Sequence, residues 1–310
     1  MSASNDFTKY LTVNKPTKQW VRQRLVGILE DSACVPSFSS AVMKLVELTK
    51  RDDVGTDELV AVIDKDVGLT TNCLRAASSA HQGAGAVTNL SEAVFRLGQC
   101  EVRRIACSVG VMDRFRNMRL KVDWRGFWLH SLLVARLCDR IAQGFRQSTG
   151  IEYLAGLMHD SGKLLLQHHF PQDFEEALMR SWSSKRSHYL SEQDILGLDH
   201  TQVSAALCQR LKLHPQICTA VLFHHNPGDR ILQFQSNGDG GFLAAVTGFA
   251  DAMAHLGAEG LGGERVVGAD FETWPEWLLL KKYDAVNGLE LDLAEEVAAT
   301  ERDLQAFEGR

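Results

Sequence analysis

"LAGLMHDSGKLLLQHH", residues 154–169, sets an adjacent histidine and aspartate, His159 and Asp160, into an otherwise apolar run. Leucines recur around the pair at the spacing of a buried helix, so both polar side chains fall where a core is expected. Burying an imidazole or a carboxylate without a partner is costly. Either the pair is satisfied within a helical core or it holds a ligand, and the rest of the chain has to decide.

Helical periodicity extends along the sequence on both sides of this pair. Apolar residues recur at intervals of three and four in segments such as 127–142 and 200–211, and Trp20 to Leu29 forms a further amphipathic helix. Asn89 has the residue type of a helix N-cap, and Gly98 that of a helix stop. No alternating strand pattern stands out, so the sequence predicts an all-α protein.

The chain divides into four predicted regions. Most histidines fall in the third region, and the fourth opens with glycines and ends in an acidic helix. The predicted boundaries are 1–30 for an N-terminal lead-in helix, 31–120 for a compact helical unit, 121–257 for the histidine-rich half and 258–310 for a C-terminal extension.

The composition is that of an ordinary globular protein, with 45% hydrophobic and 23% charged residues over 310 positions. No apolar stretch approaches the ~20 residues of a membrane-spanning helix, and the N-terminus has no secretory signal. The seven cysteines include no C-x-x-C pair and lie mostly in apolar stretches, which suits a reducing compartment. We therefore expect a cytoplasmic protein without a membrane partner.

Nucleic acid is not expected among the partners. The net charge is −6, and no dense Lys/Arg run occurs. Arginines do cluster in residues 101–121, but a solvated helix face explains them more simply than DNA contact. The glycine loop "HQGAGAV", residues 81–87, follows no strand, which makes it a weak candidate for nucleotide binding.

Several helices each direct a histidine or a carboxylate inward. His130, for example, precedes apolar residues at i+3, i+4 and i+7. Taken singly, such a residue is usually a hydrogen-bonded core histidine. Taken together, they favour a shared cation, which neutralises the carboxylates and satisfies the imidazoles at once. The candidate ligands are His130, His159, Asp160, His200, His224, His225 and Asp251.

Imidazole nitrogen with carboxylate oxygen suits zinc, iron, manganese or nickel, and ligand type alone does not choose among these divalent metals. Lys163 lies one turn beyond His159 and could reach an anionic ligand, although a solvated lysine at a helix end is an equal alternative. Other histidines, among them His188, His214 and His255, have no evident companions in the sequence.

The sequence from "VPSFSSAVMKLVEL" (35–48) to "EVRRIACSVG" (101–110) resembles the first half of an HDOD domain, the HD-related output domain of bacterial signalling proteins. The matching features are P-x-x-x-x-x-V-x-x-L, I-x-x-D-x-x-L-T, L-R-x-A-x-S and A-V-x-x-L-G. The second half, from "FWLHSLLVARLC" to "GFADAMAHL", is similar to the HD phosphohydrolase superfamily. The resemblance covers about residues 30 to 257.

This resemblance implies an HD-domain-like helical fold with an N-terminal helical subdomain, and a place in bacterial signal transduction. Many HDOD members have lost the metal site, whereas the set retained here is similar to the ligands of HD-GYP cyclic-dinucleotide phosphodiesterases. That likeness implies one metal held by His130, His159, Asp160 and Asp251, and a second metal, bridged by Asp160, held by His200, His224 and His225. Lys163 matches the lysine of the HD-x-G-K motif, which approaches the phosphate.

The chain departs from the HD-GYP pattern in two places. "HHNPGDRILQ", residues 224–233, lacks the glycine-tyrosine-proline signature, which disfavours hydrolysis of cyclic di-GMP. Gly126 stands one turn before His130, where those enzymes can carry an extra glutamate ligand, which disfavours a third metal.

Two hypotheses follow. In the first, a signalling protein retains a mono- or dinuclear metal centre and hydrolyses a phosphoester or nucleotide, with Asp160 and Lys163 as catalytic residues. In the second, the same fold is a non-catalytic scaffold that binds a partner protein or a nucleotide. The partner is accordingly a signalling protein or a small phosphorylated ligand, and the sequence does not indicate the oligomeric state.

Overall fold

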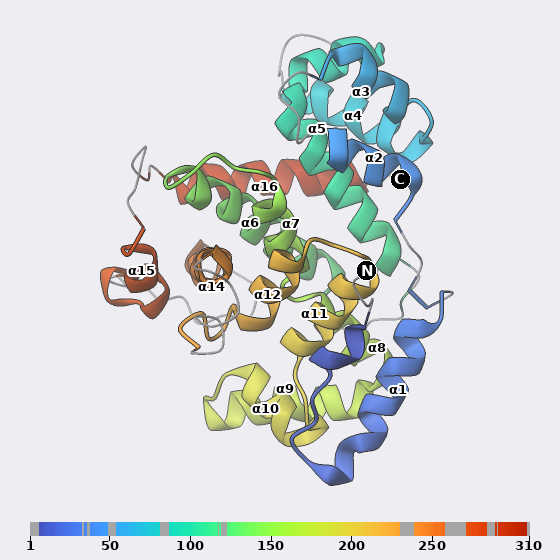
Figure 1. The fold of residues 1–310 in the computed structure, drawn as a ribbon. Coiled ribbons are helices and arrows are strands. Elements are labelled where there is room, and N and C mark those ends of the chain that lie inside the picture. The colour runs from blue at the N-terminus through green and yellow to red at the C-terminus, as the bar shows by residue number, and fades with distance from the viewer. Residues whose placement is uncertain are drawn as a thin grey trace.

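The structure is a computed structural model of the 310-residue chain (Figure 1). It describes residues 6–32, 34–35, 38–48, 54–80, 87–116, 118, 123–229, 239–257, 271–283, 289 and 291–308. Every regular element within these ranges is a helix, which confirms the all-α prediction. The glycine loop 81–87, apart from Val87, and most of residues 117–122 lie outside the described residues.

The N-terminal part of the chain builds an upper lobe in Figure 1 from α2, α3, α4 and the first part of α5. The elements of this N-terminal part, in chain order, are η1 (Phe7–Tyr10), η2 (Pro16–Lys18), α1 (Gln19–Glu30), α2 (Ser40–Leu48), α3 (Thr56–Ile63), α4 (Val67–Ala80) and α5 (Leu90–Phe115). Asn89 caps α5 as predicted, because its side chain accepts bonds from the backbone N–H groups of Ser91 and Glu92. Gly98, with φ +74°, kinks α5 rather than ending it, since the helix resumes and continues to Phe115.

The second part of the chain surrounds α7. Its elements are α6 (Trp124–Gln143), α7 (Ile151–Met158), α8 (Ser161–His169), α9 (Pro171–Ser184), α10 (His188–Leu196), α11 (His200–Arg210), α12 (Pro215–Phe223), α14 (Asp239–Gly257), η3 (Phe271–Thr273), α15 (Pro275–Leu280) and α16 (Leu293–Glu308). The short helix α7 packs against α5, α6, α12 and α14. The end of α7 therefore lies in the middle of the fold.

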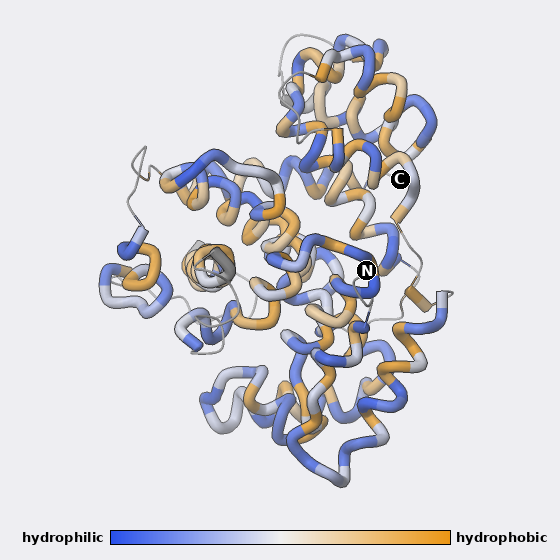
Figure 2. Tube along the Cα trace, viewed as in Figure 1, coloured by the Kyte–Doolittle hydropathy of each residue, from blue (hydrophilic) through white to orange (hydrophobic). Residues whose placement is uncertain are grey.

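Hydrophobic residues gather where these central helices meet (Figure 2). Trp128 of α6 is fully buried among the rings of Phe115, Trp124 and Phe127. Two glycines set close helix contacts. A Cβ on Gly162 of α8 would collide with the backbone of α11, and one on Gly248 of α14 would collide with the backbone at the end of α12. Because these two glycines carry no Cβ, α8 packs closely against α11 and α14 packs closely against the end of α12.

The C-terminal helix α16 packs along α6 and also reaches α4. Arg136 of α6 donates from Nε to Glu296 and from Nη1 to Asp303, each at 2.9 Å. Arg140 donates to the other oxygen of Glu296 at 2.9 Å. Acidic residues of α16 thus pair with arginines of α6. The predicted domain boundary at residue 120 remains a prediction.

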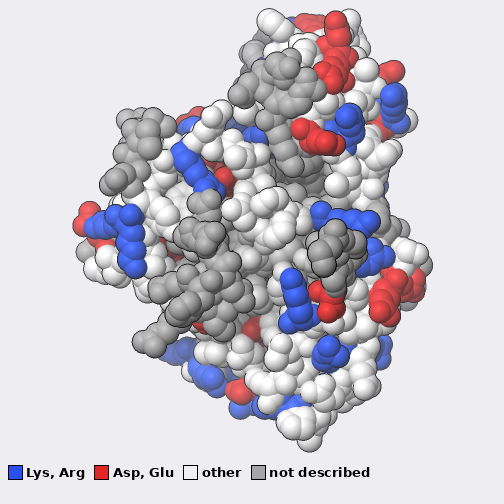
Figure 3. Space-filling view, in the orientation of Figure 1, with Lys and Arg blue, Asp and Glu red and all other residues white. Residues whose placement is uncertain are grey.

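Within the described residues, no helix has both the length and the hydropathy that crossing a membrane requires. On the face drawn in Figure 3, Lys and Arg side chains are interspersed with Asp and Glu side chains.

Candidate metal centre

His159 and Asp160 form the junction between α7 and α8, and both are buried. The Nδ1 atom of His159 lies 2.7 Å from the carbonyl oxygen of Gly156, which assigns the ring proton to Nδ1. In the neutral ring the electron pair is then on the other nitrogen, Nε2, which faces His130, Asp160 and Asp251. This is the tautomer that a metal-binding histidine adopts.

A first group of ligand-type atoms surrounds His159. His130 of α6 brings its Nε2 atom to 3.3 Å from Nε2 of His159. Asp251 of α14 places Oδ1 at 3.1 Å from Nε2 of His130 and 3.5 Å from Nε2 of His159. Ligands bound at 2.0–2.2 Å to one cation lie about 3.0–3.5 Å from one another. The three residues therefore have the spacing of a shared coordination sphere.

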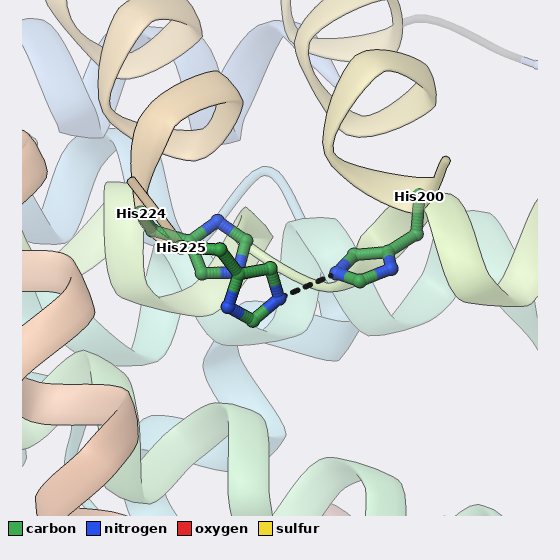
Figure 4. A group of neighbouring side chains, drawn as sticks. All are labelled: His200, His224 and His225. Atoms are coloured by element: carbon green, nitrogen blue, oxygen red, sulfur yellow. Dashed lines mark hydrogen bonds between the residues drawn. The ribbon is translucent and has the colours of Figure 1, made fainter. Parts of the chain in front are cut away.

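A second group consists of His200, at the start of α11, with His224 and His225 at the end of α12 (Figure 4). The Nε2 atoms of His200 and His225 are 3.1 Å apart. Nδ1 of His224 lies 2.8 Å from the carbonyl oxygen of Val221, so that Nε2 is again the free atom. That Nε2 atom is buried and has no hydrogen-bond partner among the described residues, so its electron pair is available to a cation.

Asp160 lies between the two groups and turns one oxygen toward each. Oδ2 is 3.4 Å from Nε2 of His159, and Oδ1 is 3.2 Å from Nε2 of His200. Nζ of Lys163 lies 2.6 Å from Oδ2. Lys163 is therefore ion-paired at the cluster, and its role near a substrate anion remains a prediction.

Burial and neighbouring charges shift the pKa values of the cluster in opposite directions. Burial acts to raise the pKa of Asp160, but Lys163 and His159 more than offset it and hold that pKa well below its usual value. Burial lowers the pKa of His200 to about 4 and that of His225 to about 3, so both are neutral near pH 7. Burial also opposes the charge on His159, yet Asp160 dominates and raises its pKa to about 10.

All seven residues predicted as ligands come together in the structure, and three further residues join them. Glu192 of α10 accepts bonds at Oε2 from Nδ1 of His200 at 2.6 Å and from its backbone N–H at 2.8 Å. His188 lies 3.4 Å from Oε1 of Glu192, and His255 lies 3.4 Å from Oδ1 of Asp251. The expectation that His188 and His255 lack companions is therefore wrong. Both contacts are i, i+4 pairs, a signal that was present in the sequence.

The cluster opens to the surface through a cleft of about 460 Å³. His130, Asp160 and Lys163 line its inner end, and the rings of Phe174 and Trp182 line a wall. A molecule of moderate size can therefore reach the ligand-type atoms without unfolding the chain.

Comparison with known proteins identifies an HDOD domain over residues 35–227. An uncharacterized protein of Treponema pallidum (strain Nichols) is 24% identical over 196 residues, which cover 62% of this chain and 38% of that protein. The match thus spans less than half of the relative's length.

Two solved structures illustrate the shared fold. An HDOD domain protein of unknown function from Geobacter sulfurreducens is 23% identical with a TM-score of 0.71, over 94% of this chain and 96% of its own. A protein from Shewanella amazonensis SB2B, provisionally named a phosphohydrolase, is 20% identical with a TM-score of 0.64, over 90% and 97%.

Proposed function

The chain belongs to the HDOD family, and from this premise we propose that it is a signalling protein whose metal centre hydrolyses a phosphoester. The observation that carries the proposal is the convergence of seven ligand-type side chains on one cluster, two of which, His130 and Asp160, line a cleft. Core histidines without a ligand would not need to gather their Nε2 atoms around two carboxylates, nor a cleft that leads to the cluster.

We assign the ligands to two positions. One is formed by His130, His159, Asp160 and Asp251, and the other by Asp160, His200, His224 and His225. The opposed oxygens of Asp160 support its role as the bridge. Nitrogen and oxygen donors in this mixture suit divalent zinc, iron, manganese or nickel.

The chain's own residues supply the rest of the site. Bound divalent cations polarise a phosphoryl oxygen and lower the pKa of water. Asp160 fixes the separation of the two positions, and Lys163, at the inner end of the cleft, places a positive charge where non-bridging phosphate oxygens would lie. His188 also lines the cleft and holds Glu192, which in turn orients His200.

The substrate is proposed only as a phosphoester. The residues after His225 lack the glycine-tyrosine-proline signature, so the likeness to cyclic-dinucleotide phosphodiesterases does not extend to that substrate. A role inside a reducing compartment is supported by the cysteines, all of which are free thiols. The upstream signal and the partner protein are left open by this proposal.

Metal analysis and turnover of bis(p-nitrophenyl) phosphate by the purified full chain test the proposal together. We expect bound transition metal, and hydrolysis that Asp160→Asn abolishes. Asp194→Asn is the matched control, because Asp194 is a carboxylate of α10 that pairs with Arg186 at the surface. Absence of bound metal in the wild type contradicts the whole proposal. Metal without turnover contradicts its catalytic half and favours the non-catalytic scaffold, with the cation as a structural element.

A further inference from the structure

The cleft that leads to the metal centre is larger than a phosphoryl group requires. Asp160, at the start of α8, and Gln167, seven residues further along, both line it. At 1.5 Å per helical residue, this side of the cleft extends about 10 Å from the cluster. One water molecule needs about 10–15 Å³ of such space, so 460 Å³ accommodates roughly 30 non-hydrogen atoms. Most of the cleft is therefore left for the organic part of a bound phosphoester.

Helix α9 forms an apolar wall of the cleft. Phe174, Leu178 and Trp182 follow one another at intervals of four residues, so they share one face of the helix, and all three line the cleft. Phe174 is buried, Leu178 is half-buried and Trp182 is exposed, so this α9 face runs from the interior to the surface. It begins close to the cluster, because the ring of Phe174 lies 5.1 Å from that of His188, which contacts Glu192.

The exposure of Trp182 is not explained by packing of the core. Tryptophan is on average a highly buried residue, yet this side chain is 66% exposed and packs against no other ring in the described part of the chain. Trp20, which is 45% exposed, by contrast packs against the ring of Phe170 at 5.8 Å. An open indole face on the wall of a cleft is suited to stack with a planar group.

The chemistry of the α9 face selects among organic groups. Its three side chains carry no charge, and the only polar atom that they contribute is the indole N–H of Trp182. A sugar would give up the hydration of its hydroxyl groups against this face and gain few hydrogen bonds in return. A planar aromatic ring loses little hydration and gains both apolar contact and stacking.

On the premise that the cluster binds a phosphoester, we propose that the substrate carries a planar aromatic group and that this group stacks on the α9 face. The phosphoryl group then occupies the inner end of the cleft, and the aromatic group lies along Phe174, Leu178 and Trp182. Trp182 determines specificity in this arrangement and takes no part in the chemistry at the cluster.

Three phosphonates serve as probes, since their P–C bond resists phosphoester hydrolysis and all share the same anionic head. They are 4-phenylbutylphosphonate, 4-cyclohexylbutylphosphonate and butylphosphonate, and their dissociation constants are measured by isothermal titration calorimetry with the full chain loaded with manganese. We expect the phenyl compound to bind at least tenfold tighter than butylphosphonate and at least threefold tighter than the cyclohexyl compound. Hydrophobicity alone predicts the opposite order for the two ring compounds, because cyclohexane is the more apolar ring.

Substitutions of Trp182 test the assignment, and its exposure makes folded variants the expected result, as circular dichroism will verify. Trp182→Leu keeps an apolar side chain but removes the ring, so it should weaken binding of the phenyl compound about fivefold and leave that of butylphosphonate unchanged. Trp182→Phe keeps a ring and should retain most of the affinity. Met179→Ala is the matched control, because Met179 is an exposed residue of α9 outside the cleft lining.

The outcomes separate this inference from the proposed function. If butylphosphonate binds and the phenyl and cyclohexyl compounds bind equally well, the aromatic subsite is overturned while phosphoester binding at the cluster stands. A folded Trp182→Leu variant that keeps the full preference for the phenyl compound also overturns it. If none of the three phosphonates binds to the manganese-loaded chain, the cluster does not hold a phosphoryl group, and both proposals fail.

Discussion

Glu192 gives a specific prediction, because it contacts His200, a proposed ligand of the second cation position. Its side chain is fully buried, and Oε2 accepts both the Nδ1–H bond and the backbone N–H bond of that histidine, at 2.6 and 2.8 Å. The carboxylate therefore fixes the ring proton on Nδ1 and directs Nε2 toward the cluster. Loss of such a partner typically costs 10–100-fold in metal affinity.

The two substitutions Glu192→Gln and Glu192→Ala should weaken metal binding by amounts near the lower and upper ends of this range, respectively. The glutamine carbonyl oxygen can still accept both bonds from His200, but the charge is lost and an NH2 group replaces the Oε1 that faces His188, so we expect about a tenfold weaker second cation site. Alanine leaves both donors of His200 buried without an acceptor and frees the ring to rotate, so we expect about a hundredfold loss.

Cobalt(II) titration monitored by visible absorption, with a competing chelator, measures the dissociation constant and the ligand geometry together. Asp194→Asn, on the same helix, is the control and should titrate as the wild type does, since that carboxylate pairs with Arg186 at 3.0 Å instead of with a cluster histidine. Thermal melts confirm that each variant is folded. If folded Glu192→Ala binds cobalt within twofold of the control and with the same spectrum, the positioning role is refuted.

Three further predictions concern packing and protons. Gly162→Ala should destabilise the fold by ~1–3 kcal/mol in urea unfolding and weaken metal binding, because its Cβ would collide with the backbone of His200. The control is Gly27→Ala on an exposed residue with open space around its Cβ, which should stabilise the fold by ~0.5–1 kcal/mol. Metal affinity should rise about tenfold per pH unit between pH 7 and 9, because the cation must displace the proton that His159 retains with its pKa of about 10. Chelator competition measures this affinity, and an affinity that does not change with pH would contradict the prediction. Trp128→Ala, a truncation of a fully buried ring, should lower the free energy of unfolding by ~3–5 kcal/mol, and a loss below ~1 kcal/mol would show that the core is not built around this ring.

Residues whose position follows from local periodicity were predictable. His130, His200 and His224 lie on apolar faces of long helical patterns, and in an all-α fold such faces turn toward a common core. Asp160 follows from its place inside an apolar run. The resemblance of the chain to HD proteins then sorted these residues into two groups, which periodicity alone could not do.

Residues whose role depends on tertiary contact were not predictable. Glu192 reaches His200 because α10 folds back onto the start of α11 through the tight turn at Gly197, and helical periodicity carries no information about that path. The kink at Gly98 is similar. A glycine signals a helix end, but whether a second helix resumes beyond it depends on what the following residues pack against.

Anomalous scattering from a crystal of the protein loaded with manganese or zinc tests the central claim most directly. We expect two peaks, one among His130, His159, Asp160 and Asp251 and the other among Asp160, His200, His224 and His225. A well-ordered cluster without any anomalous peak at saturating cation would contradict it.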